Sequence, residues 1–239
     1  MTFRQMFQPP PWVTGGISTG DAAFLVELVR RETPATVLEI GVAAGTSSAA
    51  LLYALDQLPG KRVLYSVDIR PTCYFDPRRT VGSAVATMYP DHRAGWILDL
   101  NGASRRDGSV VYDLAFIDGN HQHPWPLLDV LSLAPWLRPA SWIALHDIAL
   151  ATVHPRFQTF GVQWLYQAWP GEKFAGEGDA RNIGAVRLPV DLADLVPMAL
   201  DLIEDRPWEG GPPGRIVLPP IFREITARLA TTRKVGTPR

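Results

Sequence analysis

The segment 36–52 constrains the fold of this chain more than any other part of the sequence. A short apolar run predicts a buried strand over 36–40, Gly41 and Gly45 follow it, and a second apolar run predicts a helix over 46–57. Glycine lets the backbone come close to a ligand where a Cβ atom would block the approach. The N-terminus of a helix offers free N–H groups and the positive end of its dipole. The segment therefore predicts a ligand-binding turn between a strand and a helix.

The rest of the chain continues this alternation of apolar strands and amphipathic helices. The strands are nearly continuous apolar runs, which is typical of strands buried on both faces. The pattern predicts an α/β fold with a doubly wound, mostly parallel seven-stranded sheet, helices on both faces and a C-terminal antiparallel hairpin. Further strands are expected at 62–67, 95–99, 112–117, 141–146, 172–176 and 182–188, and helices at 20–31, near 81–88, at 125–137, near 156–168, at 191–204 and at 219–231.

Length and composition limit the class of protein. The chain has 239 residues, which we interpret as one domain over 1–239, with an N-terminal arm at 1–17 and a C-terminal extension at 205–239. The net charge of −1 gives no electrostatic case for nucleic-acid binding. No apolar run reaches the roughly 18 residues of a membrane helix, and the first residues lack a signal-peptide core. Cys73 is the only cysteine, which excludes an internal disulfide. A cytoplasmic protein is the expectation.

The acids near the glycine turn indicate what kind of ligand it binds. Glu39 comes at the end of the first strand, in the pattern E-x-G-x-x-x-G rather than the G-x-G-x-x-G of dinucleotide-binding turns. A carboxylate there would repel a pyrophosphate and attract an ammonium or sulfonium group. Asp68 ends the next strand, about 20 residues further on, where an acid can accept hydrogen bonds from ribose hydroxyls. A cationic nucleoside therefore fits better than NAD.

These two acids and the glycine turn resemble the first motifs of the class I S-adenosylmethionine-dependent methyltransferases. The resemblance implies that S-adenosyl-L-methionine is the cofactor, with Glu39 at its amino-acid end and Asp68 at its ribose. The positions that it assigns to cofactor binding in this part of the chain are Glu39, Gly41, Ala43, Gly45, Ser47, Asp68 and Ile69.

Polar residues recur where the predicted strands end. In doubly wound sheets, ligands bind at the carboxyl ends of the strands. Five consecutive strands end in such residues, and this repetition predicts a site along one edge of the sheet. The residues are Glu39, Asp68, Asp99, Asp118 and the pair His146-Asp147.

The segments 112–123 and 142–148 resemble a signature of one branch of these enzymes, written IDG-x-H … HD. The branch includes the cephalosporin hydroxylase-like and macrolide sugar O-methyltransferases and is related to the catechol-type enzymes; the resemblance covers about residues 18–190. It implies that Asp118, His146 and Asp147 hold a divalent cation, Mg²⁺ or Mn²⁺, and that His121 is the catalytic base. Asp118 is also expected to contribute to catalysis and to cofactor binding.

One position departs from the pattern of this branch. His146 replaces the usual carboxylate, and a mixed nitrogen and oxygen ligand set suits Mn²⁺, Fe²⁺ or Zn²⁺ better than Mg²⁺. The alternative without a metal is that Asp118 caps a helix and His146 packs under a loop.

The turn after strand 95–99 resembles the Gly-Ala-Ser turn that faces adenine in the catechol-type enzymes. This resemblance adds Asp99, Ala103 and Ser104 to the expected cofactor site, although Asp99 can equally be a strand cap. Tyr74, Trp125 and Trp164 are candidates for the walls of an acceptor pocket, or else ordinary core residues.

The sequence as a whole favours O-methylation of a small hydroxylated acceptor. The alternatives are metal-independent methyl transfer to nitrogen, cofactor binding without catalysis, and an NAD-dependent oxidoreductase, which the missing G-x-G-x-x-G counts against. We expect a small-molecule acceptor and neither a nucleic-acid nor a membrane partner, and self-association into a homo-oligomer stays open.

Overall fold

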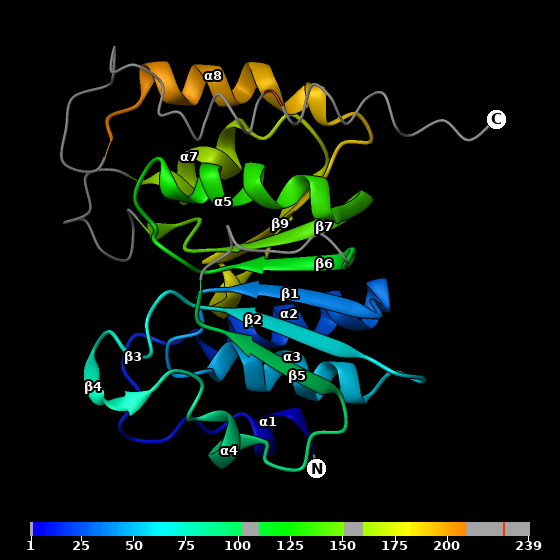
Figure 1. Ribbon diagram of the computed structural model, residues 1–239, viewed down its shortest axis with the longest axis vertical. Helices are drawn as coiled ribbons and strands as arrows, with labels where there is room; N and C mark the ends of the chain where they lie inside the picture. Colours follow the sequence, from blue (N-terminus) through cyan, green and yellow to red (C-terminus); the bar gives the residue numbers. More distant parts are fainter. Residues whose placement is uncertain (1, 102–109, 151–159, 209–226, 228–239) are drawn as a thin grey trace.

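A computed structural model describes residues 2–101, 110–150, 160–208 and 227 of the chain (Figure 1). Its centre is a seven-stranded sheet with the order β5-β2-β1-β6-β7-β9-β8. The first five of these strands run parallel, and β9 is antiparallel to both β7 and β8. The strands are β1 (Thr36–Ile40), β2 (Val63–Val67), β5 (Gly95–Asp99), β6 (Tyr112–Ile117), β7 (Leu137–His146), β8 (Lys173–Ala175) and β9 (Ile183–Arg187).

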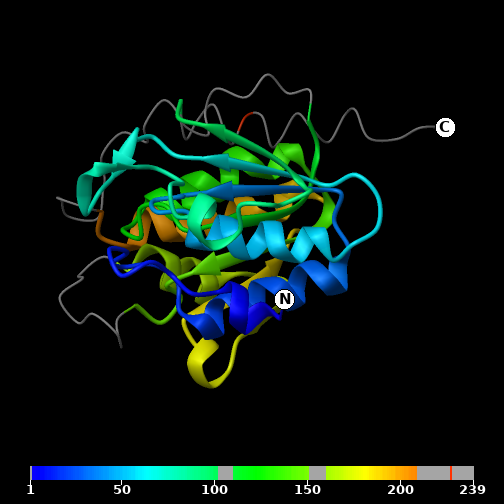
Figure 2. The same cartoon turned by 90° about the horizontal axis from the view of Figure 1, so that it is seen from below.

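Helices cover both faces of this sheet. Figure 2 shows α2 (Thr19–Glu32) and α3 (Thr46–Asp56) together along one face. The other face carries α5 (Trp125–Leu133), α7 (Gly161–Ala168) and α8 (Val196–Asp205). Neighbouring strand residues serve different cores: Val37 packs with α2 and α3, whereas Leu38 packs with α5. Successive side chains of a strand point to opposite faces, so the continuous apolar runs fill two cores at once.

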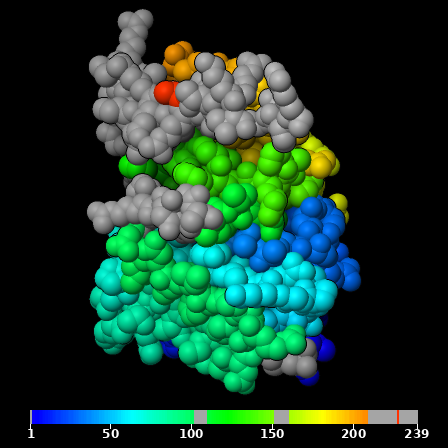
Figure 3. All heavy atoms as spheres, turned by 45° about the vertical axis from the view of Figure 1, so that its right-hand side comes forward, coloured from blue at the N-terminus to red at the C-terminus, as the bar shows by residue number. Residues whose placement is uncertain are grey.

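Segments far apart in the sequence also meet at the end of the sheet where its parallel strands begin, which Figure 3 brings forward. There the end of α2 lies beside the turn that precedes β2. The Arg62 guanidinium donates to the Thr33 carbonyl over 3.1 Å, which ties this turn to the end of α2.

The predicted fold class is confirmed, and most predicted strands agree with the structure within a residue. Differences of several residues concern four elements. The helix expected over 191–204 begins with a 3-10 turn, Leu192–Leu195, and α8 itself starts at Val196. β7 begins at Leu137 rather than 141, and α4 covers only Val85–Met88. The helix expected over 125–137 ends at Leu133 and continues as a 3-10 turn, Ala134–Trp136, in which Pro135 cannot donate the next helical hydrogen bond. The helix expected at 219–231 lies outside the described residues, apart from residue 227.

Two features of the structure were not predicted. A small antiparallel sheet joins β3 (Thr72–Cys73) and β4 (Asp76–Thr80), whose charged and mostly exposed residues have no apolar alternation. The segment 1–17, expected as an N-terminal arm, packs on the domain: α1 (Phe3–Met6) forms there, and Phe7 and Ile17 are buried in the core beside α2 and α3. Among the described residues, no helix has the length and apolar character needed to span a membrane.

Candidate active site

The predicted site residues gather where the parallel strands end. Asp68 follows β2, Asp118 follows β6 and Asp147 follows β7. The strands β2 and β6 point in the same direction in Figure 1. Asp118 directly follows β6, and its N–H donates to the Ile40 carbonyl at the end of β1 over 2.7 Å. Pairing of the strands thus brings distant parts of the sequence to one edge of the sheet. Glu39 and Asp147, for example, are 108 positions apart in the chain.

The glycine turn is locked against the backbone of the chain itself. Gly41 has a φ of +84°, and a Cβ atom there would lie 2.0 Å from the Asp118 carbonyl oxygen. Gly45 has a φ of +89°, and a Cβ atom there would lie 2.9 Å from Gly82 Cα. The approach shown at both glycines is to protein backbone, and their predicted approach to a ligand stays a prediction. Gly41 therefore fixes the position of Asp118.

Asp68 lies against this turn. One of its carboxylate oxygens, Oδ2, accepts hydrogen bonds from the N–H groups of Val42 and Ala43, each over 3.1 Å. The other oxygen accepts from the Arg70 N–H over 2.9 Å. The next residue, Ile69, is 78% exposed, which is unusual for a large aliphatic side chain. The structure thus places Asp68 against Ala43 at the turn, and contact of Asp68, Ala43 and Ile69 with a cofactor stays a prediction.

Glu39 has a different environment from the one expected. Its side chain is fully buried, and its oxygens accept hydrogen bonds from the hydroxyls of Ser47, Ser48 and Ser66 over 2.6, 2.6 and 2.5 Å. Burial and the charge of Asp118 raise the pKa of Glu39, whereas the hydrogen bonds from the three serines lower it. The resulting pKa is about 7. The partners of Glu39 are therefore protein hydroxyls, including that of Ser47, and contact of either residue with the cofactor stays a prediction.

Replacement of Glu39 by glutamine should change the pH dependence of stability. A carboxyl group whose folded pKa is about 7 holds its proton more tightly than in the unfolded chain, where 4.5 is ordinary. Its favourable contribution is complete below pH 4.5 and is lost as the pH rises to 7, about 3 kcal/mol in all. We expect the unfolding free energy of the wild type to fall relative to that of Glu39→Gln across this window, as measured by urea denaturation. Parallel pH profiles would contradict the assignment.

The predicted adenine-binding turn is only partly described. Asp99 Oδ1 accepts hydrogen bonds from the Asn101 N–H over 2.8 Å and from its side-chain amide over 2.7 Å. Asp99 therefore does cap the end of its strand, which was one of the two interpretations. Ala103 and Ser104 lie outside the described residues.

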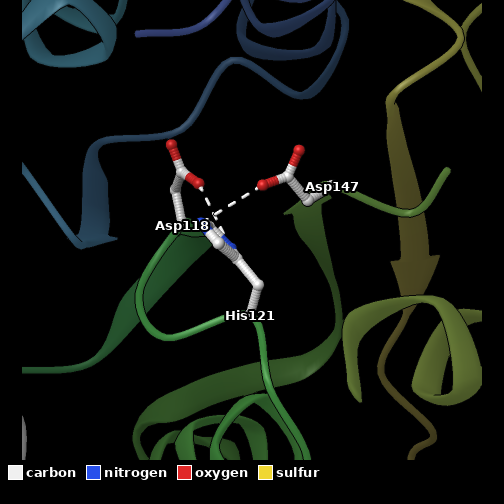
Figure 4. Close-up of side chains that lie close together, drawn as sticks. All are labelled: Asp118, His121 and Asp147. Carbon is white, nitrogen blue, oxygen red and sulfur yellow. Dashed lines mark ion pairs between the residues drawn. The ribbon is translucent and has the colours of Figure 1, made fainter. Parts of the chain in front are cut away.

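Asp118, His121 and Asp147 form a cluster at the centre of the site (Figure 4). Each offers one ligand atom, and these atoms lie within 4.8 Å of one another. His121 Nε2 is 3.2 Å from Asp147 Oδ2, and His121 Nδ1 is 3.9 Å from Asp118 Oδ1. Asp147 has a φ of +65° and accepts a hydrogen bond from the Asn182 amide over 2.5 Å, so the backbone and a neighbouring side chain both hold it in place.

His146 lies beside this cluster, and its role as a metal ligand stays a prediction. Its Nδ1 is 3.0 Å from Asp118 Oδ1 and its Nε2 is 3.3 Å from Asp21 Oδ2, so both ring nitrogens face carboxylates. Burial lowers the pKa of His146, but the charges and hydrogen bonds of Asp118 and Asp21, with the charge of Asp147, raise it well above the ordinary value. Among the described residues, the group that could hold a metal ion contains His121 together with Asp118 and Asp147.

The charge of His146 also keeps Asp118 ionised. Burial raises the pKa of Asp118, whereas the charge of His146, its hydrogen bond and the charge of His121 lower the pKa, and the net shift is downward. Asp118 is therefore a carboxylate at neutral pH. This is the form that can bind a cation or orient an imidazole.

Two of the three proposed pocket aromatics are open to solvent. Tyr74 is 60% exposed and Trp125 is 46% exposed, whereas Trp164 packs against the core under α5. Partial burial raises the pKa of Tyr74, and the charges of Asp118 and Asp147 raise it further. Tyr74, on the unpredicted β3–β4 hairpin, is therefore close enough to the acidic cluster to sense its charge.

The sequence reasoning missed Asp21 and Asn182 as site residues. Ser18 and Asp21 have the spacing of a helix capping box, which predicts a cap but gives no sign of a contact with His146, 125 positions away. Asn182 lies in the predicted turn before the last strand, where asparagine is ordinary. Both contacts depend on tertiary structure and leave no local signal.

Comparison with known proteins agrees with this geometry. Residues 38–148, which contain the glycine turn and the Asp118 cluster, match the family described as a methyltransferase domain. No curated protein sequence matches the chain.

Solved structures share the fold at low sequence identity. The O-methyltransferase TomG from Streptomyces achromogenes, in complex with SAM, is 19% identical with a TM-score of 0.52, over 72% of this chain and 81% of that one. An O-methyltransferase from Bacillus cereus, in complex with SAH, is 17% identical with a TM-score of 0.51, over 73% and 84%. Cofactor-bound Rv0187 from MTB is 15% identical with a TM-score of 0.54, over 79% and 86%.

Residues 38–148 thus match a methyltransferase domain. The sheet order and the position of the site are those of a Rossmann-like α/β methyltransferase fold, as the sequence predicted.

Proposed function

We propose that the protein transfers a methyl group from S-adenosylmethionine to the oxygen of a small hydroxylated acceptor, with His121 as the general base. The observation that carries this proposal is the contact between His121 and Asp147 at the carboxyl edge of the sheet. A base beside the methyl donor suits a hydroxyl, which must lose its proton on methylation. The O-methyltransferase structures with the same fold support the choice of oxygen.

The cofactor would lie along the glycine turn. Asp68, at the end of β2, would accept hydrogen bonds from the ribose hydroxyls, and exposed Ile69 would offer an apolar surface to the adenine. When bound, S-adenosylmethionine supplies a methyl group on a positively charged sulfur, and the carboxylates of Asp118 and Asp147 give this edge the complementary charge.

The proton would move to His121 Nδ1. The Asp147 carboxylate, 3.2 Å from His121 Nε2, favours the tautomer with its proton on Nε2. This leaves the lone pair of Nδ1 free, and Nδ1 is buried with no hydrogen-bond partner among the described residues. As the new carbon–oxygen bond forms and the carbon–sulfur bond breaks, Nδ1 would take the hydroxyl proton. Asp147 and Asp118 would then stabilise the imidazolium that results.

The same cluster also suits a divalent ion, which gives a second candidate arrangement. Asp118, Asp147 and His121 would hold the ion, and two oxygens with one nitrogen fit Mn²⁺, Fe²⁺ or Zn²⁺ better than Mg²⁺. A bound ion would act as a Lewis acid that lowers the pKa of the acceptor hydroxyl. A ring nitrogen that binds an ion cannot also take a proton, so the two roles exclude each other at that nitrogen.

Chelation distinguishes the two arrangements. With His121 as base and no metal, methyl transfer to a hydroxylated acceptor should continue unchanged in excess EDTA. With a metal, activity should be lost and then restored by Mn²⁺ more than by Mg²⁺. The assay measures S-adenosylhomocysteine formed with an acceptor chosen from a panel of small phenols and sugars.

Replacement of Asp68 by alanine should weaken cofactor binding by about 1.5–3 kcal/mol, the range for losing hydrogen bonds to a charged group. Titration calorimetry with S-adenosylhomocysteine measures this loss. Asp99→Ala is a useful comparison, because the Asp99 side chain accepts hydrogen bonds from Asn101 at the end of the neighbouring strand. Unchanged binding in Asp68→Ala, or binding of NADH by the wild type, would rule out the proposed cofactor site.

A further inference from the structure

Asp21 reaches the active site from the first turn of α2, although no motif assigns it there. Its side chain is 3% exposed, and its Oδ2 atom lies 3.3 Å from His146 Nε2. On the other side of the same ring, His146 Nδ1 lies 3.0 Å from Asp118 Oδ1. The imidazole of His146 thus bridges two carboxylates, one on a helix and one in the catalytic cluster.

We propose that Asp21 is a positioning residue that holds the His146 ring against Asp118 and thereby orients the Asp118 carboxylate for the reaction. This proposal builds on the proposed function, because Asp118 matters through its contact with His121 or with a cation. Asp21 itself touches neither the acceptor nor the cofactor in this scheme.

The geometry explains why such a residue is needed. His146 is 7% exposed and is the last residue of β7, so its main chain is fixed, but the ring still needs a partner to set its rotation. The Asp21 carboxylate can only accept hydrogen bonds, so it selects the orientation in which Nε2 faces α2 and Nδ1 faces Asp118. The contact with Nδ1 fixes Asp118 Oδ1, which is also the atom that faces His121 Nδ1 over 3.9 Å.

Residues behind a ligand or a base commonly set its orientation, and their loss typically costs about 10–100-fold in affinity or activity. His146 occupies a position where a metal-binding carboxylate was expected from the resemblance. In this chain the histidine instead links Asp21 on α2 to Asp118. His146 therefore belongs to the site through its contacts with these two carboxylates.

The rival explanation is that Asp21 only caps α2. Ser18 and Asp21 form a reciprocal capping box: the Ser18 hydroxyl donates to Asp21 Oδ2 over 2.7 Å, and the Asp21 N–H donates to Ser18 Oγ over 3.0 Å. The same atom, Asp21 Oδ2, also faces His146 Nε2, so the cap and the contact share one oxygen. A cap alone also gives no reason for His146 Nε2 to face this carboxylate.

Two variants separate these explanations. Ser18→Ala removes the hydroxyl bonds of the cap and leaves the Asp21–His146 contact, whereas Asp21→Ala removes both. Loss of a helix cap lowers stability, so both variants should unfold more easily than the wild type. Only Asp21→Ala should release the His146 ring.

The first readout is the ring N–H signal of His146 in ¹H–¹⁵N NMR spectra of the full chain without ligands, assigned by its absence in His146→Gln. The signal of a bridged, buried ring should persist in Ser18→Ala and disappear through solvent exchange in Asp21→Ala. The second readout is methyl transfer to an acceptor that the wild type uses. Its kcat should fall about 10–100-fold in Asp21→Ala with an unchanged KM for S-adenosylmethionine, and should change less than about threefold in Ser18→Ala.

Should Asp21→Ala not fold, Asp21→Asn keeps an acceptor for Ser18 but replaces a charged partner of His146 by a neutral one. It should lower kcat by about 5–10-fold, still more than Ser18→Ala does. Equal ring signals and equal kcat in the Asp21 and Ser18 variants would overturn the proposal and leave Asp21 a helix cap. If the wild type methylated no acceptor while the ring signal was still lost in Asp21→Ala, the result would contradict the proposed function but support the bridge between Asp21 and Asp118 through His146.

Discussion

Replacement of His121 by alanine is expected to lower methyl transfer by about 10²–10⁴-fold while binding of S-adenosylhomocysteine stays near normal. General-base catalysis typically contributes this factor, about 3–5 kcal/mol of barrier. His121 is suited to the role because Asp147 Oδ2 contacts its Nε2 and its Nδ1 has no hydrogen-bond partner among the described residues. Turnover on a hydroxylated acceptor, measured with saturating cofactor, gives the kinetic value, and calorimetry gives the binding value.

His92→Ala is the matched control for this substitution. His92 is a partly buried histidine whose Nδ1 contacts the Ala94 carbonyl, at the opposite end of β5 from the site. It should keep its turnover. If His121→Ala kept its turnover, the chemistry would have to depend on Asp118 or on a metal ion instead.

The second large effect is expected at Gly41. A side chain there would combine a strained φ of +84° with a contact of 2.0 Å to the Asp118 carbonyl oxygen, which is backbone and cannot turn aside. Gly41→Ala should therefore destabilise the protein by about 3–5 kcal/mol, near the upper end for single substitutions. For a chain of this size that corresponds to a fall in Tm of about 6–20 °C.

Gly60→Ala is the control that separates the strain of a positive φ from the steric clash expected at Gly41. Gly60 has the same φ of +84°, but a Cβ atom there would meet nothing within 4 Å. Gly60→Ala should thus cost only the left-handed conformation, about 1–2 kcal/mol. Thermal unfolding of the two variants under identical conditions tests the difference. Equal losses would mean that the glycine turn and the Asp118 loop can separate at little cost.

The sequence predicts the sheet well because its information is local. The strands over 36–40 and 112–117 are apolar runs ended by Gly41 and Asp118, and both hold in the structure. The β3–β4 hairpin could not be read in the same way, because its residues are mostly exposed and leave no apolar pattern. Its position beside the site depends on tertiary packing.

The candidate site is predicted as a place more accurately than as a set of contacts. Asp118, His121 and Asp147 do come together, because parallel strands deliver their carboxyl ends to one edge. The partners of Glu39 and His146 could not be predicted, since they depend on which side chains fill the space around a buried group. Three serines surround Glu39 and Asp21 reaches His146, and neither arrangement follows from spacing along the chain.

A crystal structure of the protein with S-adenosylhomocysteine and Mn²⁺ tests the central claim most directly. The account predicts the nucleoside along the glycine turn, with its ribose hydroxyls on Asp68 and its sulfur facing the space beside His121. An anomalous peak among Asp118, His121 and Asp147 would select the metal arrangement, and its absence would select His121 as an unassisted base. A nucleoside bound away from the carboxyl edge of the sheet would contradict the account.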